Sequence, residues 1–178
     1  MLSIFSGKEK LAPRPKIAEI LRGLIGGSFS IFVLLLLGQL SGHLFIMAPF
    51  GASCVLLYAA SQSPLAQPRN IIFGHFLSAL VGLIFLKSFG VHLWTVALSV
   101  GAAIAVMQST RCIHPPAGAN PLVILLTANT IHYDWSFLIF PVLVGAVSLV
   151  LIAWFVNNIQ TKQKWPSYAL AITETKTL

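Results

Sequence analysis

Two short stretches decide how this chain folds: Ala48-Pro49-Phe50-Gly51-Ala52-Ser53 and Pro115-Pro116-Ala117-Gly118-Ala119-Asn120. Each breaks an apolar region with proline and glycine, and the two align so that proline, glycine and alanine coincide. In a membrane, a helix breaker is tolerated only where the freed backbone is buried in protein or lines a water-filled cavity. A matched pair of broken segments in the two halves of a chain is typical of a transporter's binding site.

The composition is that of a membrane protein. Of the 178 residues, 57% are hydrophobic and 8% are charged, whereas about a quarter of the residues of a soluble chain are charged. Between Gly23 and Asn157 the charged residues are Arg69, Lys87, Arg111 and Asp134. A soluble domain could not solvate its surface with so few charges.

The net charge of +7 comes mainly from basic residues near the two ends of the chain. We therefore predict one transmembrane domain at residues 20–157, between a basic cytoplasmic segment at 1–19 and a cytoplasmic tail at 158–178. The N-terminal segment has neither the apolar core nor the cleavage site of a signal peptide. These features place both termini on the cytoplasmic side of the inner (plasma) membrane, and tails this short argue against nucleic acid as a partner.

Hydropathy separates six apolar stretches, at about residues 20–40, 44–60, 71–89, 93–109, 115–128 and 135–156. The second and the fifth are short and broken, so each half of the chain reads long, broken, long. We predict an all-α membrane protein with four long transmembrane helices and two short half or re-entrant segments, arranged as two inverted three-segment repeats. Whether the broken segments cross the membrane stays open, because the basic loop residues favour six passes over four by a single residue.

The fifth stretch predicts a binding site at the start of a half-helix. Pro115 and Pro116 suit the first turn of a helix because they lack a backbone donor. The free amide groups that follow, at Gly118 and Ala119, carry partial positive charge and attract anions. Gly118 also lets an ion approach the backbone.

The second stretch offers the same device. Pro49 opens it, Gly51 and Ala52 supply amide groups, and Ser53 supplies a hydroxyl donor. In an inverted repeat the two helix starts face each other near the middle of the membrane. We expect a small inorganic anion to bind there, with Ser53 and Asn120 completing its shell.

The ionisable residues also favour an anion. No Asp or Glu lies within an apolar stretch, whereas cation and proton pathways normally use intramembrane carboxylates. Arg69, Arg111 and His114 would concentrate anions at an entrance, and Asn70 adds an amide donor. His75 lies inside the third stretch, where it either binds a neighbouring helix through a hydrogen bond or lines the path and relays protons.

Three other functions stay open: a proton- or cation-coupled carrier, a copper-like metal transporter and a non-transporting membrane scaffold. The metal hypothesis rests on soft ligands near the broken segments, namely Cys54, Cys112, His114, Met47 and Met107. Their spacing is not that of a metal cluster, and the two cysteines are better explained as buried free thiols. The chain has no catalytic motif, so we expect neither an enzyme nor a cofactor, and its small residues permit a homo-oligomer.

The stretch His114-Pro115-Pro116-Ala117-Gly118-Ala119 resembles the HPP family of small integral membrane proteins. A second set of residues is similar to the same family: 48–53, Ser63-Pro64-Leu65-Ala66-Gln67-Pro68-Arg69-Asn70 and Gly74-His75. The likeness covers about Ile17 to Val156. It implies four membrane-spanning helices and transport of nitrite, with which family members in plant chloroplasts and cyanobacteria are associated.

Overall fold

The computed structural model describes residues 13–159, 161 and 163–168, and these residues form helices and loops without a strand. Parts of the predicted terminal segments, 1–12, 160, 162 and 169–178, lie outside the described residues. In chain order the elements are α2 (Ile17–Ser41), α3 (Ala48–Ala59), η1 (Pro64–Ala66), α4 (Pro68–Phe89), α5 (Leu93–Ser109), η2 (Pro115–Ala119), α6 (Asn120–Thr127), η3 (Trp135–Leu138), η4 (Ile139–Leu143) and α7 (Val144–Asn158).

Prolines mark where helices begin, and glycines mark where two of them end. Pro49, Pro68 and Pro121 lie in the first turns of α3, α4 and α6, where the missing backbone donor leaves no hydrogen bond unmade. α2 ends at Gly42 and α4 ends at Gly90, with φ angles of 71° and 70° that glycine adopts without a steric penalty. Helical elements occupy each of the six predicted apolar stretches, as expected.

Three helical segments are long and apolar enough to cross a membrane: 17–41, 68–89 and 135–158. α5, expected as a fourth long helix, has 17 residues and a length of about 25 Å, which is less than the roughly 30 Å of a hydrocarbon core. The segment 135–158 is itself kinked, since Phe140 has extended backbone angles (φ −120°, ψ 118°) before Pro141. The sequence predicts four long transmembrane helices, and the described residues contain three.

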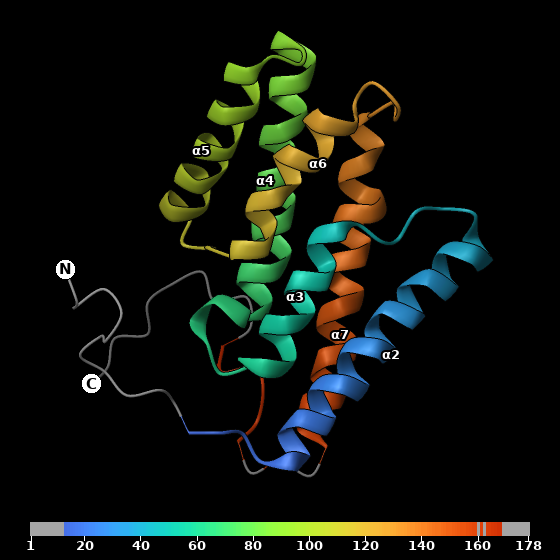
Figure 1. The fold of residues 1–178 in the computed structure, drawn as a ribbon, viewed down its shortest axis with the longest axis vertical. Helices are drawn as coiled ribbons and strands as arrows, with labels where there is room; N and C mark the ends of the chain where they lie inside the picture. The colour runs from blue at the N-terminus through green and yellow to red at the C-terminus, as the bar shows by residue number, and fades with distance from the viewer. Residues whose placement is uncertain (1–12, 160, 162, 169–178) are drawn as a thin grey trace, which may run out of the picture.

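The two broken segments form short helices that start near the middle of the molecule. α3 runs from there toward the end at which α2 begins, and α6 runs toward the opposite end (Figure 1). α2 and α3 pack against each other and against α7, while α5 and α6 pack against each other and against α4. η2 lies where the two groups meet, because it contacts α3, α4, α5 and α6.

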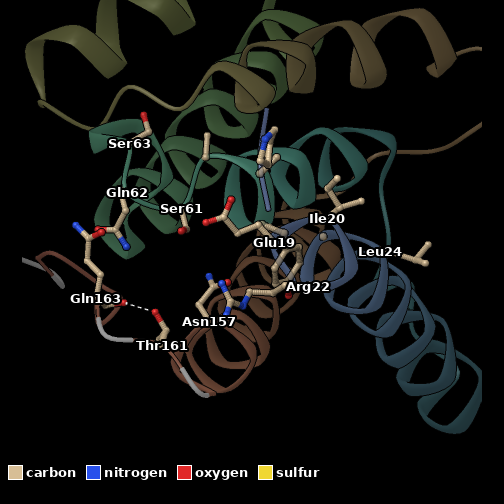
Figure 2. Close-up of a pocket in the computed structure, with 15 residues that line it drawn as sticks. Glu19, Ile20, Arg22, Leu24, Ser61, Gln62, Ser63, Asn157, Thr161 and Gln163 are labelled. Carbon is tan, nitrogen blue, oxygen red and sulfur yellow. Dashed lines mark hydrogen bonds between the residues drawn. The ribbon is translucent and has the colours of Figure 1, made fainter. Parts of the chain in front are cut away.

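A cavity of about 530 Å³ opens at the end of the molecule where α2 begins and α7 ends (Figure 2). Its lining combines the charged side chains of Glu19 and Arg22 with the amide side chains of Gln62, Asn157 and Gln163. None of residues 48–53 and 115–120 lines it. The cavity is therefore separate from the point at which the half-helices start.

After α7 the chain folds back onto the loop between α3 and α4. Trp165 is buried there, and its indole N–H donates to the carbonyl of Ala66 (3.3 Å). The backbone N–H of Ser167 donates to Oε1 of Gln67 (2.8 Å). Residues 163–168 of the predicted tail are thus packed against the helical domain.

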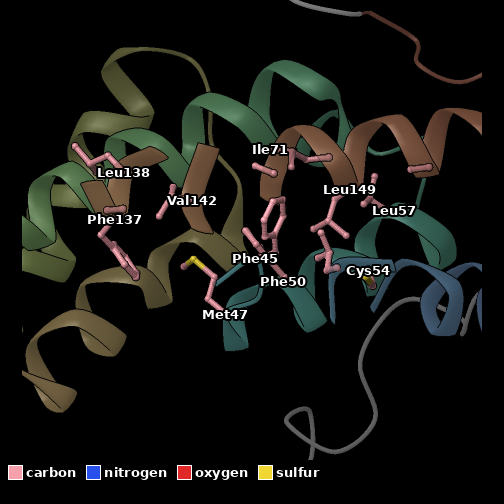
Figure 3. Close-up of a cluster of buried hydrophobic side chains, with 14 of the residues drawn as sticks. Phe45, Met47, Phe50, Cys54, Leu57, Ile71, Phe137, Leu138, Val142 and Leu149 are labelled. Carbon is pink, nitrogen blue, oxygen red and sulfur yellow. The ribbon is translucent and has the colours of Figure 1, made fainter. Parts of the chain in front are cut away.

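The main hydrophobic core lies between α3, α4 and α7. Figure 3 shows Phe50, Cys54 and Leu57 of α3 near Leu149 of α7, with Ile71 of α4 in the same cluster. Four of these five side chains are fully buried, and Cys54 is nearly so. Burial of such side chains stabilises the fold because it brings them into dense van der Waals contact.

We expect Gly145→Ala to destabilise the protein, because the added Cβ would collide with the ring of Phe50 and lie 2.8 Å from the carbonyl oxygen of Phe45. Overpacking of this kind costs about 1–3 kcal/mol. The control is Gly101→Ala, where the new Cβ meets nothing within 4 Å and helix propensity favours alanine. Thermal unfolding in detergent compares the two variants, and equal midpoints would contradict the packing described here.

Candidate functional site

Four polar side chains from different parts of the chain meet where the two half-helices begin. Ser53 lies in the second turn of α3, His75 in α4, His114 immediately before η2, and Asn120 at the first residue of α6. All four residues are fully buried, with 0% exposure. Buried polar groups are costly unless they are hydrogen-bonded, and all four are.

Ser53 is at the centre of this network. Its Oγ lies 2.8 Å from Nε2 of His75 and 2.9 Å from Nε2 of His114. On the other side of the His75 ring, Nδ1 lies 3.2 Å from the amide nitrogen of Asn120, which also donates to the backbone carbonyl of His75 at 2.9 Å. Nδ1 of His114 lies 2.8 Å from the carbonyl of Leu65. Each half-helix thus supplies one residue that holds one nitrogen of the His75 ring.

The network has a consistent set of donors when both histidines are neutral. The carbonyl of Leu65 can only accept, so Nδ1 of His114 carries the proton and Nε2 accepts from the Ser53 hydroxyl, for which the Pro49 carbonyl at 3.2 Å is a second, longer acceptor. Ser53 Oγ then accepts from the Nε2–H of His75, whose Nδ1 accepts from Asn120. The hydrogen bonds therefore point in one direction, starting at the Asn120 amide and ending at the Leu65 carbonyl.

Two residues that the sequence analysis did not single out support the network. The ring of Phe50 packs edge-on against His75, with the ring centroids 5.0 Å apart. Ser78 donates to the carbonyl of Ala117 in η2 at 2.6 Å. Ser78 follows His75 by three residues on the same face of α4, so helical spacing is the signal that could have indicated it.

Gly74 lets the loop before η2 approach α4 closely. An ideal Cβ at this position would lie 2.8 Å from Cβ of His114 and 3.0 Å from the carbonyl oxygen of Cys112. A larger residue would push His114 away from Ser53. Gly74 makes room for His114, and the next residue of α4 is His75. These two consecutive residues therefore allow both histidines to reach Ser53.

The predicted arginines lie outside the network and shape the loop that carries His114. Arg69 donates from Nη2 to the carbonyl of Thr110 (2.8 Å) and from Nε to that of Arg111 (3.4 Å). Arg111 is exposed, and its φ of 57° is a left-handed conformation that few non-glycine residues adopt. Asn70 donates to the carbonyl of Ile113 at 2.7 Å. These contacts fix the backbone immediately before His114.

Tyr168 ties the C-terminal segment to the same region. Its hydroxyl lies 2.8 Å from Oδ1 of Asn70 and 2.7 Å from the carbonyl of Pro64. Burial raises the pKa of Tyr168, and the Arg69 guanidinium opposes that shift, so the hydroxyl keeps its proton at neutral pH and donates to one acceptor at a time. Tyr168 follows Asn70 by 98 positions, and no local pattern in the sequence indicates such a contact.

Most of the remaining residues that the sequence predicts to bind substrate lie beside the buried network and not within it. An apolar groove of about 530 Å³ between α3 and η2–α6 is lined by Ala48, Pro49, Ala52, Leu56, Pro115, Pro116, Ala119 and Val123. Gly51 is exposed, and Gly118 is half-buried with nothing within 4 Å of a Cβ built on it. Of the residues expected to supply backbone amides, Ala52 and Ala119 therefore border this open groove, whereas polar side chains form the buried centre.

Among the described residues, no three His, Cys, Asp or Glu side chains come together as a possible metal site. His75 and His114 use both of their ring nitrogens in hydrogen bonds within the protein. Cys112 is buried, with its Sγ 3.1 Å from Oγ1 of Thr110, and Cys54 is buried in the hydrophobic core. Among the described residues the copper-like alternative thus gains no cluster of three His, Cys, Asp or Glu ligands.

Ser53→Ala should destabilise the protein more than Ser148→Ala. The first change leaves Nε2 of His75 and of His114 buried without a partner, at about 1–3 kcal/mol for each unsatisfied group. Ser148 is the matched control, because its hydroxyl donates only to the carbonyl of Val144 one turn earlier in its own helix. Denaturant or thermal unfolding in detergent measures both losses. Losses of equal size would mean that Ser53 does not hold the two histidines.

The comparisons with known proteins agree with this membrane architecture. Residues 12–166 match the HPP family, transmembrane region. The chain is 36% identical over 174 residues to a transmembrane protein of Dictyostelium discoideum, covering 92% of this chain and 60% of that protein. A second transmembrane protein of the same organism is 34% identical over 175 residues, covering 92% of this chain and 55% of that protein.

This chain thus spans between one half and two thirds of the length of these curated relatives. No solved structure matches it. The family match includes both broken stretches and all four residues of the buried network. On that match, the protein belongs to the HPP family of transmembrane proteins.

Proposed function

We propose that this protein is a transporter for a small monovalent inorganic anion, with nitrite as the leading substrate and a proton as its companion. The observation that carries the proposal is the double contact of His75, which Ser53 holds at one ring nitrogen and Asn120 at the other. Ser53 and Asn120 occupy the same place in the two broken stretches. Both half-helices therefore lead to one buried imidazole, and discontinuous helices of this kind form substrate sites in many transporters.

The proposal includes an inverted repeat, with residues of α2–α4 and α5–α7 as its two halves. Packing supports it, because the first two helices of each half pack against the third helix of the other half. The opposite directions of α3 and α6 support it as well (Figure 1). In this arrangement α5 is the counterpart of α2 and is the fourth membrane-spanning helix. A helix of 17 residues can span the membrane where the bilayer is locally thin.

Charge favours an anion in this site. Glu19 and Asp134 are the acidic residues in the described part of the chain, and neither belongs to the network. The starts of α3 and α6 contribute partial positive charge, and each imidazole can take up a proton. A buried anion is costly without a compensating charge, and one proton on the histidine pair supplies it. Nitrite fits these demands, since it is small and planar and its oxygens accept hydrogen bonds.

We infer that the conformation described here is the occluded state of the proposed transporter. Ser53, His75, His114 and Asn120 are fully buried, and their hydrogen bonds are made within the protein. An anion therefore reaches the histidines only when Ser53 moves away from them. The Ser53 hydroxyl and a protonated imidazole Nε2 then become donors to the anion, and such charge-assisted hydrogen bonds are strong.

We place both termini on the cytoplasmic side of the inner (plasma) membrane. α2 begins and α7 ends at the same end of the molecule (Figure 1). The described basic residues near the two ends of the chain are Arg14, Lys16, Arg22 and Lys164. Basic residues of this kind stay on the cytoplasmic side of membrane proteins.

His75→Gln should reduce nitrite uptake into proteoliposomes by about tenfold or more, because glutamine keeps a donor and an acceptor but takes up no proton. His132→Gln is the matched control, since His132 is exposed and pairs with Asp134 in a loop. Nitrate, formate, chloride and bicarbonate serve as competitors that rank the substrates. Saturable nitrite uptake that both variants keep in full would remove His75 from the path, and no uptake of any of these anions would remove the transport proposal.

A further inference from the structure

We propose that α2, α3 and α7 hold a phospholipid whose headgroup carries both a phosphate and a primary ammonium group, as in phosphatidylethanolamine. The site has two connected parts at the end of the molecule where α2 begins. One is the polar cavity shown in Figure 2, and the other is an apolar groove between α2 and α3. Neither part belongs to the buried histidine network, so this inference does not depend on the transport proposal.

The polar cavity presents both signs of charge. Figure 2 shows the side chains of Glu19, Arg22 and Asn157 gathered in this cavity. Arg22 is half-buried, and in the described part of the chain it makes no hydrogen bond or ion pair. Glu19 accepts one hydrogen bond from the backbone N–H of Lys16 (3.0 Å), which leaves most of the acceptor capacity of the carboxylate free. A phosphate next to Arg22 and an ammonium next to Glu19 would each find an opposite charge.

A buried acceptor in the same cavity requires a donor. Asn157 is 5% exposed, and its amide nitrogen donates to the carbonyl of Leu57 at 2.9 Å. Its Oδ1 is buried with no hydrogen-bond partner among the described residues. Buried polar atoms without a partner are rare in folded proteins. Asn157 lines the cavity, so its amide has only to turn toward the cavity for the N–H groups of a primary ammonium to satisfy this oxygen, whereas the quaternary ammonium of a choline headgroup has no N–H to donate.

The apolar groove continues directly from the polar cavity. Its volume is about 370 Å³, and it shares Gly23, Tyr58 and Ala59 with the cavity. Gly23, Gly27 and Gly51 leave open space, because a Cβ built on any of them meets nothing within 4 Å. The glycines thus keep free a channel that an acyl chain can occupy while its headgroup lies in the polar cavity. A polar ligand without an acyl chain would leave this groove empty.

The test is thermal unfolding of the purified full chain in detergent, with added phosphatidylethanolamine, phosphatidylcholine or phosphatidylglycerol of identical acyl chains. A lipid that binds the folded state alone raises the unfolding midpoint. We expect phosphatidylethanolamine to raise it most, because it alone pairs a phosphate with N–H donors on a cation. Equal shifts for the three lipids would overturn the headgroup assignment.

Gly27→Leu should abolish the shift by filling the groove, and native mass spectrometry should show that the bound lipid is lost. Gly101→Leu is the matched control, since its side chain also enters open space but lies on α5, away from the groove. Glu19→Gln keeps an acceptor for the Lys16 N–H and removes the charge, so it should remove the preference for phosphatidylethanolamine over phosphatidylglycerol. Binding that survives Gly27→Leu, or a preference that survives Glu19→Gln, would contradict the proposal.

Discussion

A serine hydroxyl has one proton to donate and two lone pairs to accept with, and Ser53 uses them to hold His75 and His114 at the same time. This arrangement requires α3, α4 and the start of η2 to converge on one point inside the molecule. Water is excluded there, so any group that loses its partner stays unsatisfied. The positions of the two half-helices relative to α4 therefore depend on this contact.

Two glycines make this convergence possible. Gly74 brings the backbone of residue 112 and the Cβ of His114 against α4, and Gly145 brings α7 against Phe50 and the loop before α3. Small residues at helix contacts are the usual means of close packing within a membrane. Phe50 then links core and site, because it packs against Gly145 on α7 and edge-on against the His75 ring. The same helices thus build the hydrophobic core and the polar network.

Much of this fold could be predicted from the sequence. The helix starts follow from Pro49, Pro68 and Pro121, whose effect on the backbone is local. The contact between the two broken stretches could be predicted from their matching positions in the two halves of the chain. The fourth apolar stretch was predicted to be a long transmembrane helix, but its 17 residues lie at the margin of what spans a bilayer.

The site was predicted less completely. The sequence drew attention to Ser53, His75, His114 and Asn120 but gave more weight to backbone amides near Gly51 and Gly118, which border open surface. The direction in which a side chain points depends on helix rotation, and the broken segments are too short and too uniformly apolar to reveal it. The contact of Tyr168 with Asn70 joins residues 98 positions apart, so only the folded chain brings it to light.

We propose that an anion and a proton bind together at the His75–His114 pair. Calorimetry of nitrite binding to the purified protein tests it directly, when it is repeated at one pH in buffers that differ in ionisation enthalpy. The difference between buffers counts the protons taken up with each anion. We expect uptake of about one proton per nitrite, since one charged imidazole balances one anion, and we expect His75→Gln to abolish that uptake. Nitrite binding without proton uptake, or uptake unchanged in the variant, would contradict it.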